Sequence, residues 1–431
     1  LRRRGSAMLA LALFVAAGAP NAWALLVPAR RVTTRGSNRI LSEASFEQHK
    51  LVAADGREDD EFGKYVAVDG NTIVVGAPGC SGCSYKKGSA HLFRTSDGGA
   101  TYVEVAELKG EEWKDYFGDS VAIDGNTIVV GARGHDDGGS WSGSAYVFRT
   151  TDGWNTHTEI KLTAADAAAG DEFGKAVAID GGTVVVGAYG KDAQTGAVYV
   201  FRTDDGGTTY GQMAKVTASD AAAGDSFGVS VAIDGDTIVV GARYAGTGGA
   251  VYVFRTTDGG ATYGQVAKLT GADAAAEDKF GQSVAIYGGT IVVGAYGKDS
   301  WTGSVYVFRT SDGGATYGQV AKLTASDAAA DDHFGKSVAI AGDTIVVGSW
   351  YDDDAGSKSG SAYVFALPST DYAQLAKLVA GDAAAGDAFG YSVAIDGDTV
   401  VIGAIGAGTG GAVYVLRTSD GGATYGQVAK L

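Results

Sequence analysis

Proline and cysteine are scarce in this chain, which has 4 prolines and 2 cysteines among 431 residues. One pair of cysteines closes only a small loop and cannot hold a fold of this size together, so a hydrophobic core must do so. Cys80 and Cys83 form a Cys-Ser-Gly-Cys loop, without a second pair or a nearby histidine to complete a zinc site. We expect a local disulfide there in an exported protein. A redox pair or half of a zinc site is the alternative in a cytosolic one.

Basic residues are outnumbered, and the formal net charge is −16 at pH 7. An acidic surface repels phosphate backbones, so nucleic acid is not an expected partner. Glycine is abundant, at 68 residues, and hydrophobic residues reach 45%. This composition is typical of many short strands joined by tight turns and not of a disordered chain.

Long apolar runs are missing after the N-terminal residues, so no membrane span is expected within the chain. The N-terminal residues are typical of an export signal, with basic Arg2-Arg3-Arg4, an apolar run and the small-x-small site Ala22-Trp23-Ala24. The run from Ala7 to Gly18 is shorter than the roughly 20 residues that a span needs. We predict a signal peptide over residues 1–24, with an uncleaved anchor as the alternative, and a linker over residues 25–44. The protein is then secreted or exposed at the cell surface.

Catalytic and metal-binding motifs are also missing. The five histidines, at positions 49, 91, 135, 157 and 333, have no partners at metal-ligand spacing, and no Gly-x-Ser-x-Gly nucleophile motif occurs. Glycosidases need two carboxylates in unlike environments, whereas the acids here recur in like ones. We therefore predict no enzyme activity, no metal site and no cofactor.

The chain does contain a repeat with a period of about 54 residues, the sign of a repeat architecture. Each copy includes Asp-x-Phe-Gly, and seven identical copies suit a structural role better than one active site. We expect the aspartate to fix the conformation of the crossover between repeats. The residues concerned are Asp60, Phe62, Gly63, Asp115, Phe117, Gly118, Asp171, Phe173, Gly174, Asp225, Phe227, Gly228, Asp278, Phe280, Gly281, Asp332, Phe334, Gly335, Asp387, Phe389 and Gly390.

Four strands are predicted in each repeat, at 230–233, 237–242, 250–255 and 263–269 in the fourth copy. Asp234-Gly235 suits the two central positions of a type I′ hairpin turn, and the second strand is apolar on both sides, so both its faces should be buried. The fourth strand carries a charge in every copy, which keeps a sheet edge from pairing with other chains. The predicted fold is all-β, a seven-bladed β-propeller of four-stranded antiparallel blades over residues 45–431. An open β-solenoid is the rival, but its coils are usually shorter.

One strand is surplus to seven blades. A fourth-strand segment near Phe46 precedes the first Phe-Gly pair, and another ends the chain at Leu431. Either the N-terminal strand completes the last blade, or the chain stops before an eighth repeat.

The pattern Asp-x-Phe-Gly-x-Ser-Val-Ala-Ile followed by Val-Val-Gly-Ala resembles the FG-GAP repeat of the integrin alpha-chain propeller, over residues 46–431. The resemblance implies an extracellular propeller used for adhesion or ligand binding and not for catalysis. Many FG-GAP blades carry a calcium loop between their first two strands. Here that position holds minimal turns such as Asp69-Gly70, which cannot supply the six or more oxygens that calcium needs, so calcium is not predicted there.

A second resemblance lies between the third and fourth strands. Thr95-Ser96-Asp97-Gly98-Gly99-Ala100-Thr101-Tyr102 is similar to the Asp-box hairpin of sialidases and other propellers. It recurs around Asp205, Asp258, Asp312 and Asp420, weakly around Asp152, and is lost near Asp371. The aspartate can hold the turn by accepting backbone N–H bonds, so we interpret the motif as structural.

Function is expected where the period breaks, in the varied loops between second and third strands. These loops should cluster on one face with the crossovers, as binding loops on a rigid scaffold do. Their aromatic and acidic residues could form a rim that binds a protein or glycan, or each aromatic could pack over its own blade. The candidates are Tyr85, His135, Asp136, Asp137, Trp141, Tyr244, Trp301, Trp350, Tyr351, Asp352, Asp353 and Asp354. The leading hypothesis is a non-enzymatic extracellular binding protein. A carbohydrate-active enzyme and an architectural wall or coat component are the alternatives.

Overall fold

The computed structural model describes residues 49–54, 56–57, 59–79, 87–367 and 372–418, together with the backbone of residues 425–427. The predicted signal peptide, the predicted linker, Tyr85 and the predicted disulfide between Cys80 and Cys83 all lie outside these residues.

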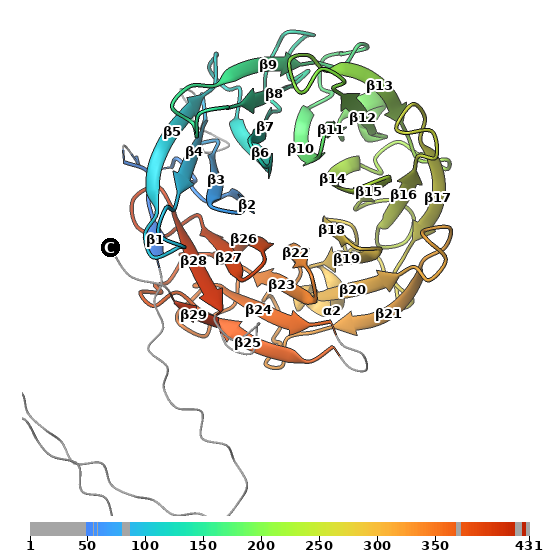
Figure 1. Cartoon of the computed structure of the whole chain (residues 1–431). Helices are drawn as coiled ribbons and strands as arrows, with labels where there is room; N and C mark the ends of the chain where they lie inside the picture. The colour runs from blue at the N-terminus through green and yellow to red at the C-terminus, as the bar shows by residue number, and fades with distance from the viewer. Residues whose placement is uncertain are drawn as a thin grey trace, which may run out of the picture. The chain divides into compact units, whose positions relative to one another are not determined.

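The strands form seven antiparallel sheets, the blades, placed radially around one axis (Figure 1). The first four blades contain, in order, β2 (Tyr65–Asp69), β3 (Thr72–Ala77), β4 (Ser89–Arg94) and β5 (Val103–Lys109); β6 (Phe117–Asp124), β7 (Thr127–Ala132), β8 (Ser144–Arg149) and β9 (Thr158–Leu162); β10 (Phe173–Asp180), β11 (Thr183–Ala188), β12 (Ala197–Arg202) and β13 (Gly211–Val216); and β14 (Phe227–Asp234), β15 (Thr237–Ala242), β16 (Ala250–Arg255) and β17 (Gly264–Leu269).

The last three blades contain β18 (Ser283–Tyr287), β19 (Thr290–Ala295), β20 (Ser304–Arg309) and β21 (Gly318–Leu323); β22 (Ser337–Ala341), β23 (Thr344–Ser349), β24 (Ser361–Ala366) and β25 (Gln374–Leu378); and β26 (Phe389–Asp396), β27 (Thr399–Ala404), β28 (Ala412–Thr418), β1 (His49–Leu51) and β29 (Tyr425–Gln427). Two four-residue helices, α1 (Lys191–Gln194) and α2 (Lys298–Trp301), lie in loops. The first strand of each blade lies nearest the axis (Figure 1). The predicted seven-bladed propeller is confirmed.

The hydrophobic core is divided among the blade interfaces. Seven buried clusters each combine residues of two adjacent blades, and one of them joins the last blade to the first. Second strands such as β15 are buried along their whole length, because a neighbouring blade covers each face. At about 1.5–3 kcal/mol for each fully buried valine or isoleucine, these interfaces supply the main stabilisation of the ring.

The Phe-Gly pair positions each blade against the one before it. Phe227 is fully buried, with its ring 5.5 Å from Tyr252 and 5.9 Å from Phe254, edge to face. Gly118 has φ +92°, and a Cβ there would lie 2.3 Å from the carbonyl oxygen of Ser89 in the preceding blade. Both the positive φ and this close approach require glycine.

The aspartate two positions before each phenylalanine has the predicted structural role. In all seven repeats its Oδ2 accepts a hydrogen bond from the backbone N–H three residues upstream, over 2.6–2.9 Å. The carboxylate thereby fixes the turn that leads from one blade into the next.

In six of the seven blades the turn between the first and second strands differs from the prediction, and only Gly288-Gly289 of the fifth has positive φ at both central positions. Asp234 pairs with Thr237, so the central residues are Gly235 and Asp236 and not Asp234 and Gly235. Gly235 has φ +54°, and Asp236 has no positive φ. Positive φ at the first central position alone is typical of type II′ and not of type I′ turns. The aspartate that ends the first strand is therefore not a central turn residue, and its carboxylate bonds to the next blade. In the third blade this residue is Asp180, whose Oδ2 accepts a hydrogen bond from Gly235 N–H over 2.5 Å.

The hairpins between third and fourth strands are held by their own aspartates, as predicted. Oδ1 of Asp97 accepts hydrogen bonds from Thr101 N–H over 2.9 Å and from the Thr95 hydroxyl over 2.7 Å. The same pattern occurs at Asp152, Asp205, Asp258 and Asp312. The likeness to the Asp-box stays a resemblance. Its copy around Asp420, and Asp371 where the motif is lost, lie outside the described residues.

The last blade is closed by both ends of the chain. β1 pairs with β28 from Val413 to Val415, and β29 pairs with the same strand from Leu416 to Thr418. In the fourth blade the single strand β17 makes both sets of pairs with β16. Closure by the N-terminal strand is therefore confirmed, and the C-terminal segment supplies the rest of the outer strand.

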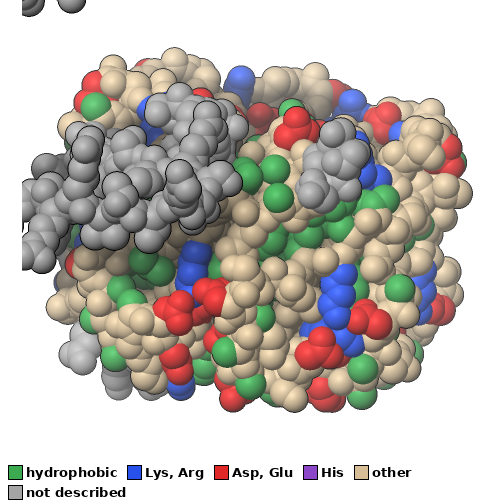
Figure 2. All heavy atoms as spheres, turned by 90° about the horizontal axis from the view of Figure 1, so that it is seen from below, with side chains coloured by type: hydrophobic (Ala, Val, Ile, Leu, Met, Phe, Trp, Pro, Cys, Tyr) green, Lys and Arg blue, Asp and Glu red, His purple; other side chains and the backbone are tan. Residues whose placement is uncertain are grey.

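The charged residue of the fourth strand is paired. In six blades its lysine Nζ lies 5.3–5.7 Å from the ring centre of a third-strand tyrosine. In five of them the lysine also forms an ion pair of 2.5–2.8 Å with a crossover aspartate. Basic and acidic side chains accordingly adjoin one another on the outer wall (Figure 2).

Candidate functional site

The varied loops and the crossovers share one face of the propeller, here called the loop face, as predicted. The glycine that ends a loop between second and third strands bridges to the phenylalanine of the next blade, for example Gly196 to Phe227. Backbone hydrogen bonds reinforce this contact, as from Ser226 N–H to the Gln194 carbonyl over 2.8 Å. Each loop is therefore anchored to the crossover beside it.

The loop of the second blade uses its polar residues to hold its own shape. Asp136 Oδ1 accepts a hydrogen bond from Trp141 N–H over 2.7 Å, and Asp137 forms an ion pair with Lys161. His135 is 1% exposed, with Nε2 3.0 Å from the Lys161 amine. These predicted candidates are engaged within the blade, although Asp136 and Asp137 stay exposed, and their place in a binding rim stays a prediction.

Trp141 also packs within its own blade. Its ring lies 5.2 Å from Tyr116 and 5.2 Å from the guanidinium of Arg133. Tyr116 is 8% exposed and Trp141 is half-buried. For this residue the alternative of packing over its own blade is the correct one.

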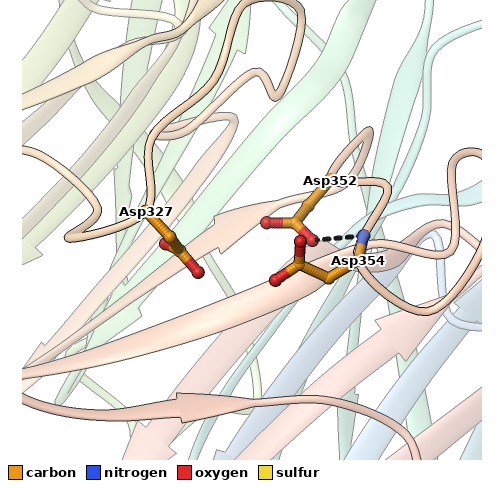
Figure 3. Close-up of side chains that lie close together, drawn as sticks. All are labelled: Asp327, Asp352 and Asp354. Atoms are coloured by element: carbon orange, nitrogen blue, oxygen red, sulfur yellow. Dashed lines mark hydrogen bonds between the residues drawn. The ribbon is translucent and has the colours of Figure 1, made fainter.

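The loop of the sixth blade repeats this arrangement. Asp353 Oδ1 accepts a hydrogen bond from Lys358 N–H over 2.6 Å, as Asp136 does in the second blade. Carboxylate oxygens of Asp327, Asp352 and Asp354 lie within 4.8 Å of one another (Figure 3). This acidic trio has the ligand chemistry of a cation site.

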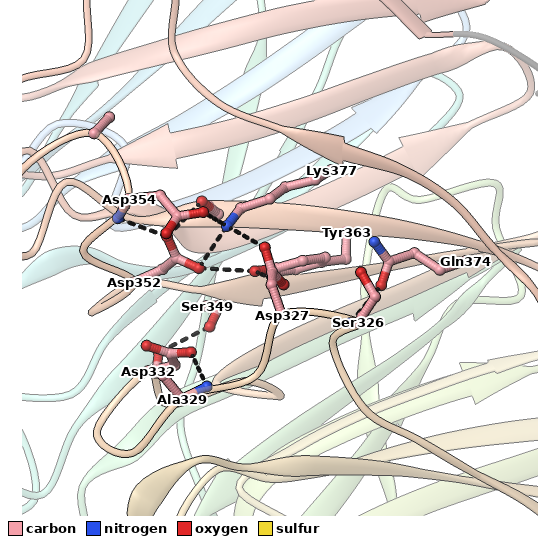
Figure 4. A network of polar contacts seen from close by, with 12 residues as sticks. Ser326, Asp327, Ala329, Asp332, Ser349, Asp352, Asp354, Tyr363, Gln374 and Lys377 are labelled. Carbon is pink, nitrogen blue, oxygen red and sulfur yellow. Dashed lines mark hydrogen bonds and ion pairs between the residues drawn. The ribbon is translucent and has the colours of Figure 1, made fainter. Parts of the chain in front are cut away.

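A lysine amine lies among these carboxylates. Lys377 Nζ is 2.7 Å from Asp327 and 3.0 Å from Asp352, and it also contacts Asp354 (Figure 4). The hydroxyl of Tyr363 donates to Asp352 over 2.7 Å. The three carboxylates raise the pKa of Lys377 well above its usual range, against the effect of burial. The ammonium thus supplies the charge that a metal ion would bring, and the trio is an extended form of the lysine–aspartate pair of the other blades.

Trp301, Trp350 and Tyr351 are brought together by the structure. They form one group, the aromatic cluster, with Tyr296, His333 and Tyr391. His333 lies at its centre, with ring centres at 5.2 Å from Trp301, 5.7 Å from Trp350 and 4.5 Å from Tyr351.

The aromatic cluster crosses blade boundaries. Trp301, in the fifth blade, contacts His333 at the start of the sixth, and Trp350, in the sixth, contacts Tyr391 of the seventh over 5.1 Å. The alternative that each aromatic packs only over its own blade is therefore wrong for these tryptophans. Trp301, Trp350 and Tyr351 are all half-buried, so each keeps an accessible surface.

A groove of about 350 Å³ adjoins the aromatic cluster. Trp350, Tyr351 and Lys358 line one side, and Asp59 and Glu61 line another. Lys358 Nζ lies 4.4 Å from the ring centre of Tyr351. The groove offers apolar surface with both signs of charge, the composition of a recognition surface for polar ligands.

Tyr244 lies apart from the cluster, in the fourth blade. It is 46% exposed, with the Arg243 guanidinium 4.9 Å and the Lys279 amine 4.2 Å from its ring centre. Burial, followed by the field of the neighbouring Lys336 amine, lowers the pKa of His333 to about 4. The histidine at the centre of the cluster is therefore neutral at physiological pH.

The central channel holds residues that the sequence interpretation missed. The seven positions directly after Phe-Gly, here called the channel ring, face the axis at the loop face. They are Lys64, Asp119, Lys175, Val229, Gln282, Lys336 and Tyr391. All of these except Asp119 line a cavity of about 200 Å³. The residue type at this position changes in almost every repeat, whereas Phe-Gly never changes. That contrast in the sequence could have identified the channel ring as a candidate site.

Asp119 balances the charge on one side of the channel. It is fully buried, with Lys175 Nζ at 3.1 Å, Lys64 Nζ at 3.7 Å and Arg133 Nε at 2.5 Å. Burial alone raises the pKa of a carboxyl group, but these cations outweigh it and lower the pKa of Asp119. Asp119 is thus an ionised structural partner for the cations of the first three blades.

Serine at the next position ties blades together around the channel. The hydroxyls of Ser120, Ser230, Ser283, Ser337 and Ser392 donate to the glycine carbonyl of the following Phe-Gly pair over 2.7–3.0 Å. Tyr65 and Ala176 replace serine in the first and third blades. The channel serines are therefore structural. The blades differ in chemistry at the channel-ring position that precedes them.

The described residues contain no helix with the length and hydrophobicity that a membrane crossing requires. No curated protein matches the chain. Among solved structures, Sqt1 of Saccharomyces cerevisiae is similar at 14% identity and a TM-score of 0.48, with 88% of this chain and 86% of that one covered.

The FG-GAP repeat matches seven segments of the chain, at residues 46–93, 111–148, 156–201, 210–254, 263–308, 317–365 and 372–416. Each match holds one Phe-Gly pair and the strands that follow it, and the seven blades are built on these segments. Because the matches cover most of its length, this chain belongs to the FG-GAP repeat family.

Proposed function

We propose that this chain is a non-enzymatic binding propeller that recognises an extracellular protein or glycan through its loop face. The observation that carries the proposal is the aromatic cluster around His333, which spans three blades and keeps accessible surface. Tryptophan and tyrosine are the residues that most often dominate binding energies, near the centres of interfaces. They occur here on the face where the repeat varies.

The pairing of the acidic residues in the varied loops supports binding over catalysis. Asp327, Asp352 and Asp354 share the Lys377 amine, and Asp136 and Asp353 accept backbone hydrogen bonds. Despite the opposing effect of burial, hydrogen bonds from Lys377 and Tyr363 lower the pKa of Asp327. A general acid needs a raised pKa instead.

The proposed setting is outside the cell, secreted or at the cell surface. It rests on the basic and apolar pattern of residues 1–24 and on the acidic composition of the chain. Adhesion is the proposed use, in line with the resemblance of the repeat to the integrin alpha-chain propeller.

A panel of extracellular proteins and glycans, presented to the purified chain, tests the proposal. Trp301→Ala and Trp350→Ala should each weaken retention of any bound partner at least tenfold, because each removes a large aromatic contact worth about 2 kcal/mol or more. Tyr287→Ala is the matched control, since Tyr287 is 51% exposed at the turn on the opposite face. Circular dichroism should show unchanged folding in all three.

Unchanged binding in both tryptophan variants would remove the loop face from consideration. Release of reducing sugar from the glycan panel would favour the carbohydrate-active enzyme instead. Self-assembly of the chain on addition of divalent cations would favour the architectural component.

A further inference from the structure

The mouth of the central channel is positively charged although the chain as a whole is acidic. Lys64, Lys175 and Lys336 line it, while the net charge of the chain is −16. Arg133 and Arg243 contact Asp119 and Gln282 of the channel ring. Some of these five cations have carboxylate partners and others have neutral partners. This difference between the two sides of the channel points to a ligand.

On the side of the first three blades every cation has a carboxylate partner. Lys64 pairs with Glu61 over 2.8 Å, Lys175 with Asp119 over 3.1 Å, and Arg133 with Glu172 over 2.8 Å. This side is neutralised by the protein itself and has no need of an external anion.

On the side of the fourth to sixth blades the cations have neutral partners. Arg243 donates to the side-chain oxygen of Gln282 over 2.8 Å and lies against Tyr244. Lys336 Nζ lies 5.1 Å from the ring centre of Tyr391, 5.4 Å from Tyr296 and 5.8 Å from Trp350. Among the described residues, neither cation has a carboxylate within ion-pair distance.

The environment of Lys336 is unfavourable for its charge. Burial, followed by the fields of Lys175, Arg243 and Lys64, lowers the pKa of Lys336 to about 7. The other titratable groups that face it are His333, with a lowered pKa, and Tyr296 and Tyr391, with raised pKa values, so all three are uncharged at neutral pH. Its remaining neighbour is the ring of Trp350. Lys336 is half-buried. A partly desolvated ammonium without a counter-charge costs stability, and an anion placed beside it would reduce that cost.

We propose that Lys336 and Arg243, at the mouth of the channel, bind the carboxylate of one aspartate or glutamate side chain presented by a protein partner. This inference rests on the proposed function, since it places the acidic side chain at the centre of the loop face. A bound partner would cover this position, and a charge-assisted hydrogen bond contributes most where water is excluded.

Size and charge favour an acidic side chain over an acidic glycan. The cavity of about 200 Å³ has room for roughly seven water-sized groups, enough for one side chain. A polyanionic glycan would bring further charges against a chain of net charge −16, and repulsion would oppose its approach. A partner that carries a single acidic group at the contact avoids this repulsion.

The test uses N-acetyl-glutamate N-methylamide as the probe and the corresponding glutamine derivative as its neutral match, titrated into the purified full chain at pH 6 and followed by NMR. The glutamate probe should bind in the millimolar range and the glutamine probe should not. Lys336→Met and Arg243→Gln should each weaken binding at least tenfold. Lys322→Met is the matched control and should not, because Lys322 lies on outer strand β21 and pairs with Asp273.

Binding should also weaken above pH 7, approaching tenfold for each pH unit, because Lys336 then loses the proton that the carboxylate requires. Lys336→Met should melt at the same temperature as the parent chain or above it, since it removes a half-buried charge with no counter-charge beside it among the described residues. Arg243→Gln, read out independently, keeps the test decisive if one variant fails to fold.

Equal binding of the two probes, or undiminished binding in both variants, would overturn the inference. Binding of glucuronate in place of the glutamate probe would overturn the choice of a protein partner. If the tryptophan variants lose a partner that Lys336→Met and excess glutamate probe leave bound, the proposed function stands and this inference fails. If the glutamate probe binds through Lys336 but the panel yields no partner, the anion site stands and the proposed function fails.

Discussion

Single residues in this chain sort into those that keep the repeat period and those that break it. Asp225 accepts a crossover N–H, Phe227 fills a blade interface and Gly228 permits close approach, and each has six counterparts in the same role. The next position, where Lys336 stands in the sixth blade, changes from repeat to repeat. Periodic residues therefore build the ring, and aperiodic ones give each blade its own chemistry.

Gly118→Ala should destabilise the propeller. The alanine would have to adopt φ +92°, at a cost of about 1–2 kcal/mol, with its Cβ 2.3 Å from the Ser89 carbonyl oxygen. We expect a loss of at least ~2 kcal/mol in the free energy of unfolding, measured by denaturant titration. Gly264→Ala is the matched control, because no atom lies within 4 Å of a Cβ there and φ is not positive. Equal stability of the two variants would contradict this account of the Phe-Gly pair.

At the scale of elements, the blades differ most in how the last one is closed. β1 provides the pairs with Val413, Tyr414 and Val415, and β29 provides those nearer the turn. Residues 428–431 carry the same Val-Ala-Lys-Leu sequence that completes β17. The chain therefore encodes two segments with the sequence for one half of this outer strand.

Leu51→Ala should cost less stability than Leu269→Ala. Both leucines are buried at equivalent positions, 6% and 4% exposed, and truncation of a buried leucine costs about 2–5 kcal/mol. Only in the last blade can a second segment of matching sequence replace the weakened strand. Thermal unfolding of both variants measures the difference. Equal losses would show that the C-terminal segment does not compete for this position.

At the scale of the whole molecule, one polar contact recurs around the ring. A fourth-strand lysine and a third-strand tyrosine both donate hydrogen bonds to a crossover aspartate. Although burial raises the pKa of a carboxyl group, hydrogen bonds from Lys322 and Tyr306 lower the pKa of Asp273 to about 2. Those from Lys215 and Tyr199 do the same for Asp166. Because their pKa values are lower in the folded than in the unfolded chain, these aspartates stabilise the fold while they are ionised.

The melting temperature should fall between about pH 4 and pH 2. The contribution of these aspartates is fully present above the unfolded pKa of about 3.9 and is lost as the pH falls through the folded pKa. Circular dichroism melts from pH 7 to pH 2 measure the change. Asp273→Asn should lower the melting temperature at pH 6 and have little further effect at pH 2. A flat profile down to pH 2 would contradict the assignment.

Much of the fold could be predicted from the sequence because its signals are local and occur seven times. Phe-Gly spacing, turn glycines and the apolar second strands each indicate the same blade. The type II′ turns were missed because Asp234-Gly235 was assigned to the centre, and only the register, Asp234 opposite Thr237, shows which residues occupy it. The candidate site was harder to predict. His135 and Trp301 stand in comparable loops, yet His135 is buried within its own blade and Trp301 contacts a residue of the next.

The sequence by itself determined the seven blades, their strand order and the face that carries the varied loops, because hydrophobic period and turn residues act over a few neighbouring positions. Only the tertiary structure decided that β1 and β29 share one strand position and that Lys377 lies among three carboxylates. It also decided that Lys336 has aromatic rings around it and no carboxylate partner among the described residues. These contacts join residues of different blades or loops. Their energies depend on the distances set by closure of the ring, which no short stretch of sequence encodes.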